Sequence, residues 1–534
     1  MADKQEDFLT RDPVTFEIVR GALYAICEEM KSVIMRTSFS PLLSLSADMS
    51  CALLDRQGNV IAQGNDIPVH LGAAKFTALA ALDAFPEETW RDGDGVLLND
   101  PYAGGTHLPD MSLVTPVMSD GEVAAFALSR IHWPDIGGIA AGSSSVCDEI
   151  IKEGLRVPPI KVLDGGKIRE DVLRLILANV RVPEDRFGDF QAALAGHRRA
   201  TERVAELCRR YGTDAVTQIM RDTQTHSLNI VNKRLSELAD MDVSNEAHLD
   251  GDGIDPDTRP RVKVNIRKTG TKLVFDFSGS ADAVKGPINA PLPVTSSAVF
   301  YTVLAFLGGD VAPNSGVYEG VEIIAPEGSI VNAQYPSPVV ASNTETSNRL
   351  VDLLMGALSK ACPEMVSAAS YGSACVYTLG GFDTVKNRPY VHYETIGGGM
   401  GAINGSDGVN GVRVHMGNTM NLPIESMEAS LPIRFHCYEL REHSGGGGRF
   451  KGGAGVRKIL EALADDMEAS VLGERTLSAP EGTSGGSPGQ VASFRIRRNN
   501  GEVLELGAKS GPHVLCKGDR LELETAGGGG WGAE

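Results

Sequence analysis

The residues best suited to chemistry are His107, Asp110 and His132, which lie within the stretch 99–138. Two imidazoles and a carboxylate offer nitrogen and oxygen ligands, a set that suits Zn, Mn or Fe and lacks the thiolates of a closed structural zinc site. Glycines and Pro109 surround His107, so a helical HExxH arrangement is not expected. The alternative interpretation is that each histidine is a hydrogen-bonded loop residue near a strand end.

A β-hairpin would bring these three residues together. Asp120-Gly121 is a favoured two-residue turn, and strands are predicted on either side of it, over Met111–Val117 and Val123–Ile131. Folding about this turn makes paired positions sum to 241, which opposes Asp110 to Ile131 and His132 to Pro109. Opposed side chains on a hairpin lie about 5 Å apart, so the open end of the hairpin should gather a metal site.

A second hairpin supplies a candidate fourth ligand. Its strands are predicted over Met49–Leu54 and Val60–Gln63. Asp48 lies at the open end of this hairpin, as Asp110 lies at the open end of the first. Asp135 could orient His132 as a supporting residue, or cap a turn. His70 is a weaker candidate for the same supporting role.

The elements around these hairpins predict a mixed α/β (α+β) fold with several domains. In the N-terminal half, helices are expected from Pro13 with Asp12 as N-cap, through 73–85, and as an αα-hairpin over 187–238 broken near 211–213. The C-terminal half is predicted to be β-rich with glycine-rich loops, with helices over 296–307 and 347–361 and a hairpin of 493–497 with 503–506. The polar stretch 241–259 is interpreted as a linker between regions 1–245 and 246–534.

Composition and charge narrow the classes of partner. The 534 residues carry a formal net charge of −19 with no long basic run, which argues against nucleic acid or an anionic membrane as partner. No apolar run approaches the roughly 18 residues that span a bilayer. The N-terminus does not resemble a signal peptide, and the eight cysteines are scattered, so we expect reduced thiols in a cytoplasmic protein.

Glycine clusters at 397–399, 445–448 and 527–530 invite a phosphate-binding interpretation. None matches GxxxxGK[ST], so the chain shows no ATP-binding signature of its own. Residues 444–458 could cradle an anion, but structural turns are the favoured interpretation. A serine hydrolase is not supported, because the serines near His70 carry no special spacing.

Several longer motifs carry a resemblance to a known family. They include NDPYAGGTHLPD (99–110), DMSCALLD (48–55), HWPDIGG (132–138), SGGGGRFKGGAGVRK (444–458) and GGGGWG (527–532). Across nearly its whole length the chain resembles the B subunit of the hydantoinase/oxoprolinase family. Its relatives include ATP-dependent N-methylhydantoinases, 5-oxoprolinases, lactamases acting on caprolactam, and acetone and acetophenone carboxylases.

The resemblance implies a divalent metal held by His107, Asp110 and His132, with Asp48 as the further ligand and Zn favoured over Mn or Fe. It also implies that ATP and Mg are bound by a separate A-type subunit, in a heterotetramer with two copies of each chain. Relatives often carry a second histidine at the position of Trp133, so Trp133 predicts a more apolar pocket wall.

The predicted function is that of a metal-binding subunit in an ATP-dependent amidohydrolase that opens a cyclic amide, such as a hydantoin, oxoproline or another lactam. Asp48, His107, Asp110 and His132 are the predicted catalytic residues, because a metal among them would polarise the carbonyl or lower the pKa of a bound water. The alternatives are a subunit of an ATP-dependent ketone carboxylase and a scaffold subunit whose metal is structural.

Overall fold

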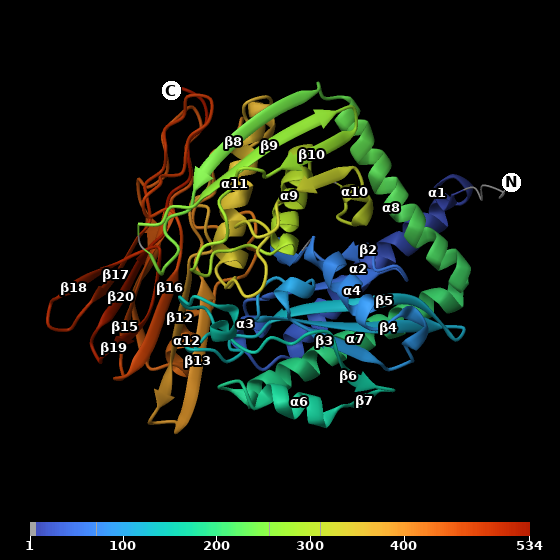
Figure 1. The fold of residues 1–534 in the computed structure, drawn as a ribbon, viewed down its shortest axis with the longest axis horizontal. Helices are drawn as coiled ribbons and strands as arrows, with labels where there is room; N and C mark the ends of the chain where they lie inside the picture. The colour runs from blue at the N-terminus through green and yellow to red at the C-terminus, as the bar shows by residue number, and fades with distance from the viewer. Residues whose placement is uncertain (1–6, 71, 256, 310) are drawn as a thin grey trace.

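The computed structural model describes residues 7–534 except 71, 256 and 310. Within this part of the chain, the strands form four sheets, and long helices pack against them (Figure 1). The fold is therefore mixed α and β, as the sequence predicts.

The first sheet has seven strands in the order β2-β1-β5-β4-β3-β6-β7. These strands are β1 (Met49–Leu54), β2 (Val60–Gln63), β3 (Gly95–Leu98), β4 (Asp110–Ser119), β5 (Glu122–His132), β6 (Ile160–Asp164) and β7 (Lys167–Ile168). Both predicted hairpins are present, since β1 pairs with β2 and β4 pairs with β5. Because β1 also pairs with β5, the two hairpins are neighbours in one sheet.

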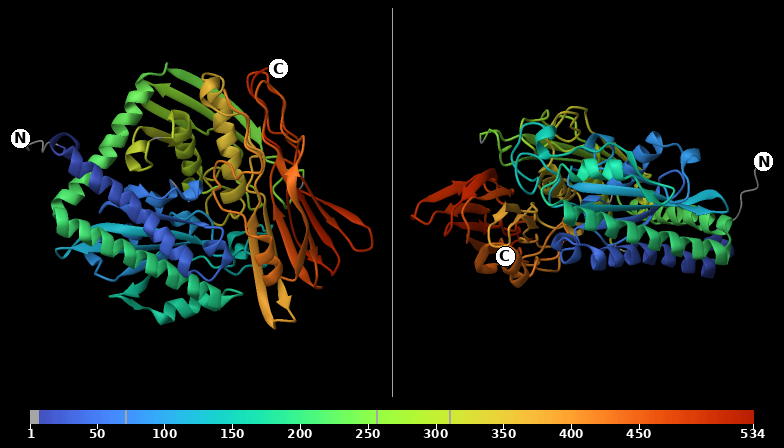
Figure 2. Two further views of the ribbon diagram at one scale, coloured as in Figure 1. Left: turned by 180° about the vertical axis from the view of Figure 1, so that it is seen from behind. Right: turned by 90° about the horizontal axis from the view of Figure 1, so that it is seen from below.

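Helices cover both faces of this sheet. The antiparallel pair α2 (Pro13–Thr37) and α7 (Pro183–Tyr211) lies along one face (Figure 2), and α4 (Ala73–Ala84) lies on the other. Helix α2 begins as predicted, with the Asp12 carboxylate accepting a hydrogen bond from the backbone N–H of Thr15.

The predicted αα-hairpin is only partly correct. Helices α7 and α8 (Thr213–Ser236) do meet at Gly212, but α8 then diverges from α7, and α7 packs along its length against α2 instead (Figure 2). The shorter α6 (Glu170–Leu177) lies beside β6 and α7.

The second sheet has the order β11-β10-β9-β8 and packs against α11. Its elements, with the helix α9 that packs against α11, are β8 (Met241–His248), β9 (Arg261–Thr269), β10 (Lys272–Asp276), β11 (Val321–Ile324), α9 (Leu292–Leu307) and α11 (Ser347–Leu358). The predicted linker at 241–259 is wrong in its first part, because 241–248 form the edge strand β8. Its polarity hid the strand: one of its half-buried positions is Asn245, whose amide donates to the carbonyl of Leu353. Residue 245 thus lies inside a strand, and the division of the chain there stays a prediction.

The remaining two sheets share one hydrophobic core. Their orders are β13-β12-β16-β19 and β14-β15-β20-β17-β18. The elements are β12 (Val376–Asp383), β13 (Arg388–Thr395), α12 (Ile424–Ser430), β14 (Ile433–Arg441), β15 (Gly455–Ala462), β16 (Met467–Leu472), β17 (Ser493–Arg497), β18 (Val503–Leu506), β19 (Lys509–Leu515) and β20 (Arg520–Glu524). The β17–β18 hairpin has the predicted bounds.

The three glycine clusters pack against one another, backbone against backbone. The N–H of Gly446 donates to Gly528, that of Gly528 donates to Gly453, and that of Gly453 donates to Met400, at 2.8 to 2.9 Å. A Cβ on Gly399 would lie 2.0 Å from the carbonyl oxygen of Gly453. The clusters therefore serve close chain packing rather than the tight turns expected from the sequence, and these N–H groups are not free to bind an anion.

No helix among the described residues combines the length and the apolarity that crossing a membrane requires.

Candidate metal centre

A β-bulge sets the register that builds the site. Next to the turn, Ser119 faces Glu122 as predicted, but the register shifts between Val117 and Met118, where Ala124 is the extra residue on β5. Beyond the bulge Asp110 therefore faces His132 directly, and the predicted pairing of Asp110 with Ile131 is wrong by one residue. The shift improves the site, because directly opposed side chains share one face of the sheet.

The neighbouring strand adds Asp48 to the same row. Met49 pairs with Ile131, and the backbone N–H of His132 donates to the carbonyl of Asp48 at 3.1 Å. Asp48, directly before β1, thus lies beside His132 on β5 and Asp110 on β4. They sit at the end of the sheet, on the face that also carries α4.

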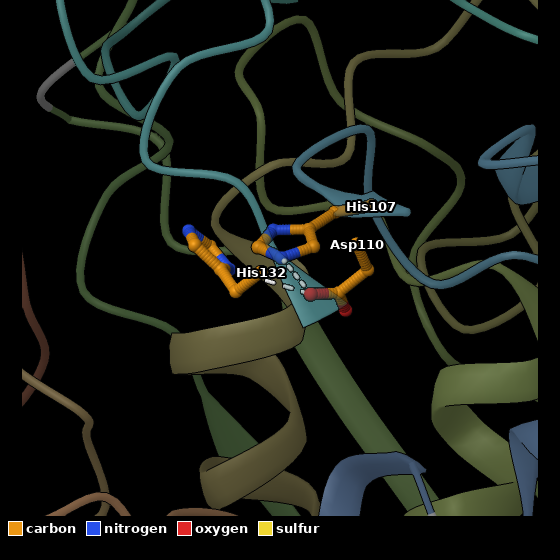
Figure 3. A group of neighbouring side chains, drawn as sticks. All are labelled: His107, Asp110 and His132. Carbon is orange, nitrogen blue, oxygen red and sulfur yellow. Dashed lines mark ion pairs between the residues drawn. The ribbon is translucent and has the colours of Figure 1, made fainter. Parts of the chain in front are cut away.

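His107, Asp110 and His132 converge on a single point (Figure 3). The Asp110 Oδ1 atom lies 3.2 Å from His107 Nε2 and 3.3 Å from His132 Nδ1. One ligand atom from each of the three residues lies within 4.8 Å of the other two. All three side chains are at most 2% exposed.

Among the described residues, two of the three converging atoms, His107 Nε2 and Asp110 Oδ1, are left without hydrogen bonds, whereas on His132 the atom without a partner is Nε2 rather than the converging Nδ1. His107 Nδ1 lies 3.2 Å from the carbonyl of Val340, which makes Nδ1 the donor and leaves a lone pair on Nε2. In the described part of the chain, His107 Nε2, Asp110 Oδ1 and His132 Nε2 have no hydrogen-bond partner. Buried polar atoms are rarely left unsatisfied, so this donor set fits a divalent cation.

The other oxygen of Asp110 is fully engaged. Asp110 Oδ2 accepts from the hydroxyl of Thr106 at 2.5 Å, from His70 Nε2 at 3.1 Å and from the Asn343 amide at 3.2 Å. His70 in turn accepts at Nδ1 from the hydroxyl of Ser50 at 2.7 Å. These bonds hold the carboxylate so that Oδ1 faces the two imidazoles, and they place His70 in the supporting position considered for it.

One of the two roles considered for Asp135 and the expectation for Trp133 are wrong. The Asp135 carboxylate does not support His132; it accepts from the backbone N–H of Gly137 and from both the backbone and the guanidinium of Arg181, so it fixes a loop. Trp133 is fully buried in the core between the sheet and α2 and α7, and it does not line the cavity at the site. Trp133 directly follows His132 in the chain, so its side chain points to the opposite face of the sheet.

The electrostatics favour the protonation state that a metal needs. Burial would raise the pKa of Asp110, but His107 and His70 outweigh it and hold that pKa well below the usual range. Burial lowers the pKa of His132 to about 4 and also lowers that of His70. At neutral pH Asp110 is therefore ionised and His132 neutral, which are the forms that bind divalent cations.

Asp48 lies slightly apart from the other three. It lines a cavity of about 30 Å³ together with His132, Asn343, Tyr393 and Arg413. Burial, with a further contribution from the Asp110 charge, raises the pKa of Asp48 to about 8. The ring of Tyr393 on β13 closes the cavity, with its centroid 4.3 Å from that of His132.

Comparison with known proteins identifies the family. The sequence pattern of the hydantoinase B/oxoprolinase family matches residues 12–534. The chain belongs to the hydantoinase B/oxoprolinase family.

Relatives within this family differ in length. The chain is 36% identical to an uncharacterised protein of Methanocaldococcus jannaschii, over 98% of this chain and 91% of that protein. It is 30% identical to a putative D-/L-hydantoinase B-type subunit of Pseudomonas sp. (strain NS671), over 100% of this chain and 92% of the relative. It is 31% identical to the 5-oxoprolinase of Dictyostelium discoideum over 98% of this chain, but it spans only 40% of that relative.

Two solved structures share the fold. The ATP-dependent caprolactamase from Pseudomonas jessenii superposes with a TM-score of 0.89 at 29% identity, covering 98% of this chain and 91% of that one. A nucleotide-free acetone carboxylase superposes with a TM-score of 0.90 at 18% identity, covering 99% and 77%, and that likeness concerns the fold alone.

Several residues around the site carry no strong sequence signal. Thr106 directly precedes His107 and could have been suspected from that position. Asn343 lies in a short π-helix (Ser342–Thr346), a rare feature that often marks functional sites. Glu153, 3% exposed, accepts from the backbone N–H groups of Val339 and Val340 at 2.6 and 2.8 Å and so fixes the carbonyl that His107 uses.

Glu153 makes folding stability depend on pH. Burial raises its pKa from 4.5 to about 8 in the folded protein. An acid whose pKa is higher in the folded state stabilises the fold fully below the unfolded pKa, and this contribution is lost as pH rises through the folded one. Glu153→Gln removes this contribution, so the Tm of the variant minus that of the wild-type protein should increase from pH 5 to pH 8.

Scanning calorimetry of both proteins across this range measures the difference, which corresponds to a few kcal/mol at about 1.4 kcal/mol per pKa unit. A Tm difference that stays constant between pH 5 and pH 8 would show that Glu153 titrates normally.

Proposed function

We propose that this chain is the metal-binding subunit of an ATP-dependent enzyme that opens a cyclic amide such as a hydantoin, oxoproline or another lactam. His107, Asp110 and His132 would hold the metal, with Asp48 as the further ligand, and Zn fits this set best, with Mn or Fe as alternatives. The observation that carries the proposal is the convergence of three buried ligand residues, two of which present an unpartnered atom to the centre, in a chain of this family.

The names of the relatives support the substrate class. The similar chains include a 5-oxoprolinase, a hydantoinase subunit and a caprolactamase, and all three names denote action on a cyclic amide. The caprolactamase is named ATP-dependent, whereas this sequence has no GxxxxGK[ST] motif. We therefore propose that ATP and Mg bind to an A-type partner subunit, in a cytoplasmic heterotetramer with two copies of each chain.

A metal at this site would supply Lewis acidity for an amide carbonyl or a bound water. The protein's own residues perform the remaining tasks. Thr106, His70 and Asn343 hold Asp110 in one orientation, and the Val340 carbonyl fixes the tautomer of His107. Tyr393 covers His132 and excludes water from that side. Cleavage of ATP on the partner would drive the uphill opening of a stable amide.

The test uses this chain co-purified with its partner subunit. Metal content is measured first, and products are then analysed with ATP and either lactams and hydantoins, or ketones with bicarbonate. Ring-opened amino acids support the proposal, whereas carboxylated ketones would replace it with the ketone carboxylase. If removal of the metal lowers Tm and leaves turnover unchanged, the metal is structural and the chain is a scaffold.

A further inference from the structure

The row of side chains next to the metal cluster contains a buried guanidinium without an ionic partner. Ser50, Arg130 and Ser112 lie side by side on β1, β5 and β4, two residues along from Asp48, His132 and Asp110. Arg130 is 0% exposed. Among the described residues, no carboxylate lies within ion-pair distance of it, and the Asp110 charge acts on it only from further away.

Two of the three guanidinium nitrogens are bonded, and both bonds are to neutral groups. Arg130 Nε donates to the hydroxyl of Ser112 at 3.0 Å, and Nη2 donates to the hydroxyl of Thr77. Nη1 has no hydrogen-bond partner in the described part of the chain. Burying a charged donor without a partner is strongly unfavourable. A ligand that accepts a hydrogen bond from Nη1 would offset this burial.

A cavity of about 150 Å³ lies beside this guanidinium. Arg130, Ser50, His70 and Tyr301 are among the residues that line it, and a water needs only about 10–15 Å³ of such volume. Asp66 also lines the cavity, but Lys31 neutralises it at 2.6 Å. The Nε2–H of His70 donates to Asp110, so Nδ1 of His70 accepts a hydrogen bond from the hydroxyl of Ser50. His70 and Ser50 are therefore neutral groups in the cavity wall.

We propose that this cavity binds a small monoanion of the carboxylate class, held by Arg130 Nη1 beside the metal cluster. Nη1 is a buried charged donor without an acceptor among the described residues, and one carboxylate oxygen would satisfy it, whereas a dianion such as phosphate would place a second charge near Asp66 and Asp110. Two kinds of ligand belong to this monoanion class, the carboxylate group of an organic molecule and bicarbonate. The inference rests on the geometry of Arg130 and holds whichever reaction the subunit supports.

The test measures anion binding to the full chain by titration calorimetry and by Tm. The metal is first removed with a chelator, so that an anion cannot bind to the metal itself. Acetate and bicarbonate are the two monoanion probes, and phosphate is the third. We expect acetate or bicarbonate to bind and to raise Tm, and the tighter of the two identifies the source.

Arg130→Met should abolish this binding, and the Tm of the ligand-free variant should be unchanged or higher, because an unpaired buried charge is replaced by an apolar side chain. Arg130→Lys keeps the positive charge but lacks the planar guanidinium donors, so it should bind the anion roughly 10-fold or more weakly. This second variant keeps the proposal testable if Arg130→Met does not fold. Ser112→Ala is the matched control, since it removes a bond to Nε and leaves Nη1 in place, and it should bind the anion normally.

Two kinds of outcome overturn the proposal, absence of binding and binding without the expected selectivity. The first is a wild-type chain that binds neither acetate nor bicarbonate, which would mean that the cavity holds only water. The second is phosphate binding as tight as that of the monoanions, or monoanion binding that survives in Arg130→Met. Neither outcome depends on turnover, so failure here is distinct from failure of the proposed amide-opening function.

Discussion

Replacing His107 with alanine is expected to remove the metal and the activity together. The substitution deletes one of three convergent ligand atoms and leaves Asp110 and His132, which hold a divalent cation far more weakly. Metal content should fall from about one equivalent per chain to under about a tenth. Turnover by the assembled enzyme should fall on the order of 1,000-fold or more.

His197 provides a matched control for this prediction. It is also a buried histidine against the β4–β5 hairpin, but it lies on the opposite face, bonded to Thr115 at 2.7 Å and to Ser129 at 2.9 Å. His197→Asn should lower Tm and retain the metal. Plasma emission spectrometry of both variants distinguishes loss of a ligand from loss of folding. If His107→Ala keeps its metal and its turnover, the metal centre is misassigned.

The second large effect is expected at Gly446. A Cβ at this position would lie 2.1 Å from the carbonyl oxygen of Ser487 and 2.8 Å from the backbone nitrogen of Gly530. Both are backbone atoms in the stacked glycine segments, so they cannot rotate away as a side chain could. Gly446→Ala should therefore destabilise the C-terminal sheets by on the order of 3 kcal/mol or more, visible as a lower Tm and faster proteolysis.

Gly447 is the adjacent control. A Cβ there would approach only the end of the Glu534 side chain, at 3.2 Å, and that flexible group can move. Neither glycine has a positive φ, so alanine strains the backbone at neither position. Gly447→Ala should leave Tm within about 1 °C of the wild-type value. Equal Tm values for the two variants would contradict the tight packing of the glycine segments.

Local signals were sufficient for much of the fold. Asp12-Pro13 predicts the start of α2, and the turn at Asp55–Gly58 with its flanking residues predicts β1 and β2 with their observed bounds. Signals of this kind fail where tertiary packing decides. The sequence did not reveal the strand β8, because a half-buried position facing α11 holds Asn245 instead of an apolar residue.

The candidate site was predictable in its ligands and not in its support. The turn at Asp120-Gly121 gathers the histidines near Asp110, but a one-residue bulge at Ala124 sets the actual pairing, and nothing in an alanine marks a bulge. Asn343 and Arg130 carry no local pattern at all. Asn343 contacts Asp110 at a sequence separation of 233 residues.

That long separation has a consequence for how the protein matures. All four candidate ligands belong to the part of the chain that leaves the ribosome first, whereas Val340, Asn343 and Tyr393 are added much later. Until then His107 lacks the carbonyl that fixes its tautomer, and His132 lacks its aromatic cover. We therefore expect a nascent chain to hold the proposed metal only loosely, and loading to be completed once Val340, Asn343 and Tyr393 have packed against the ligands.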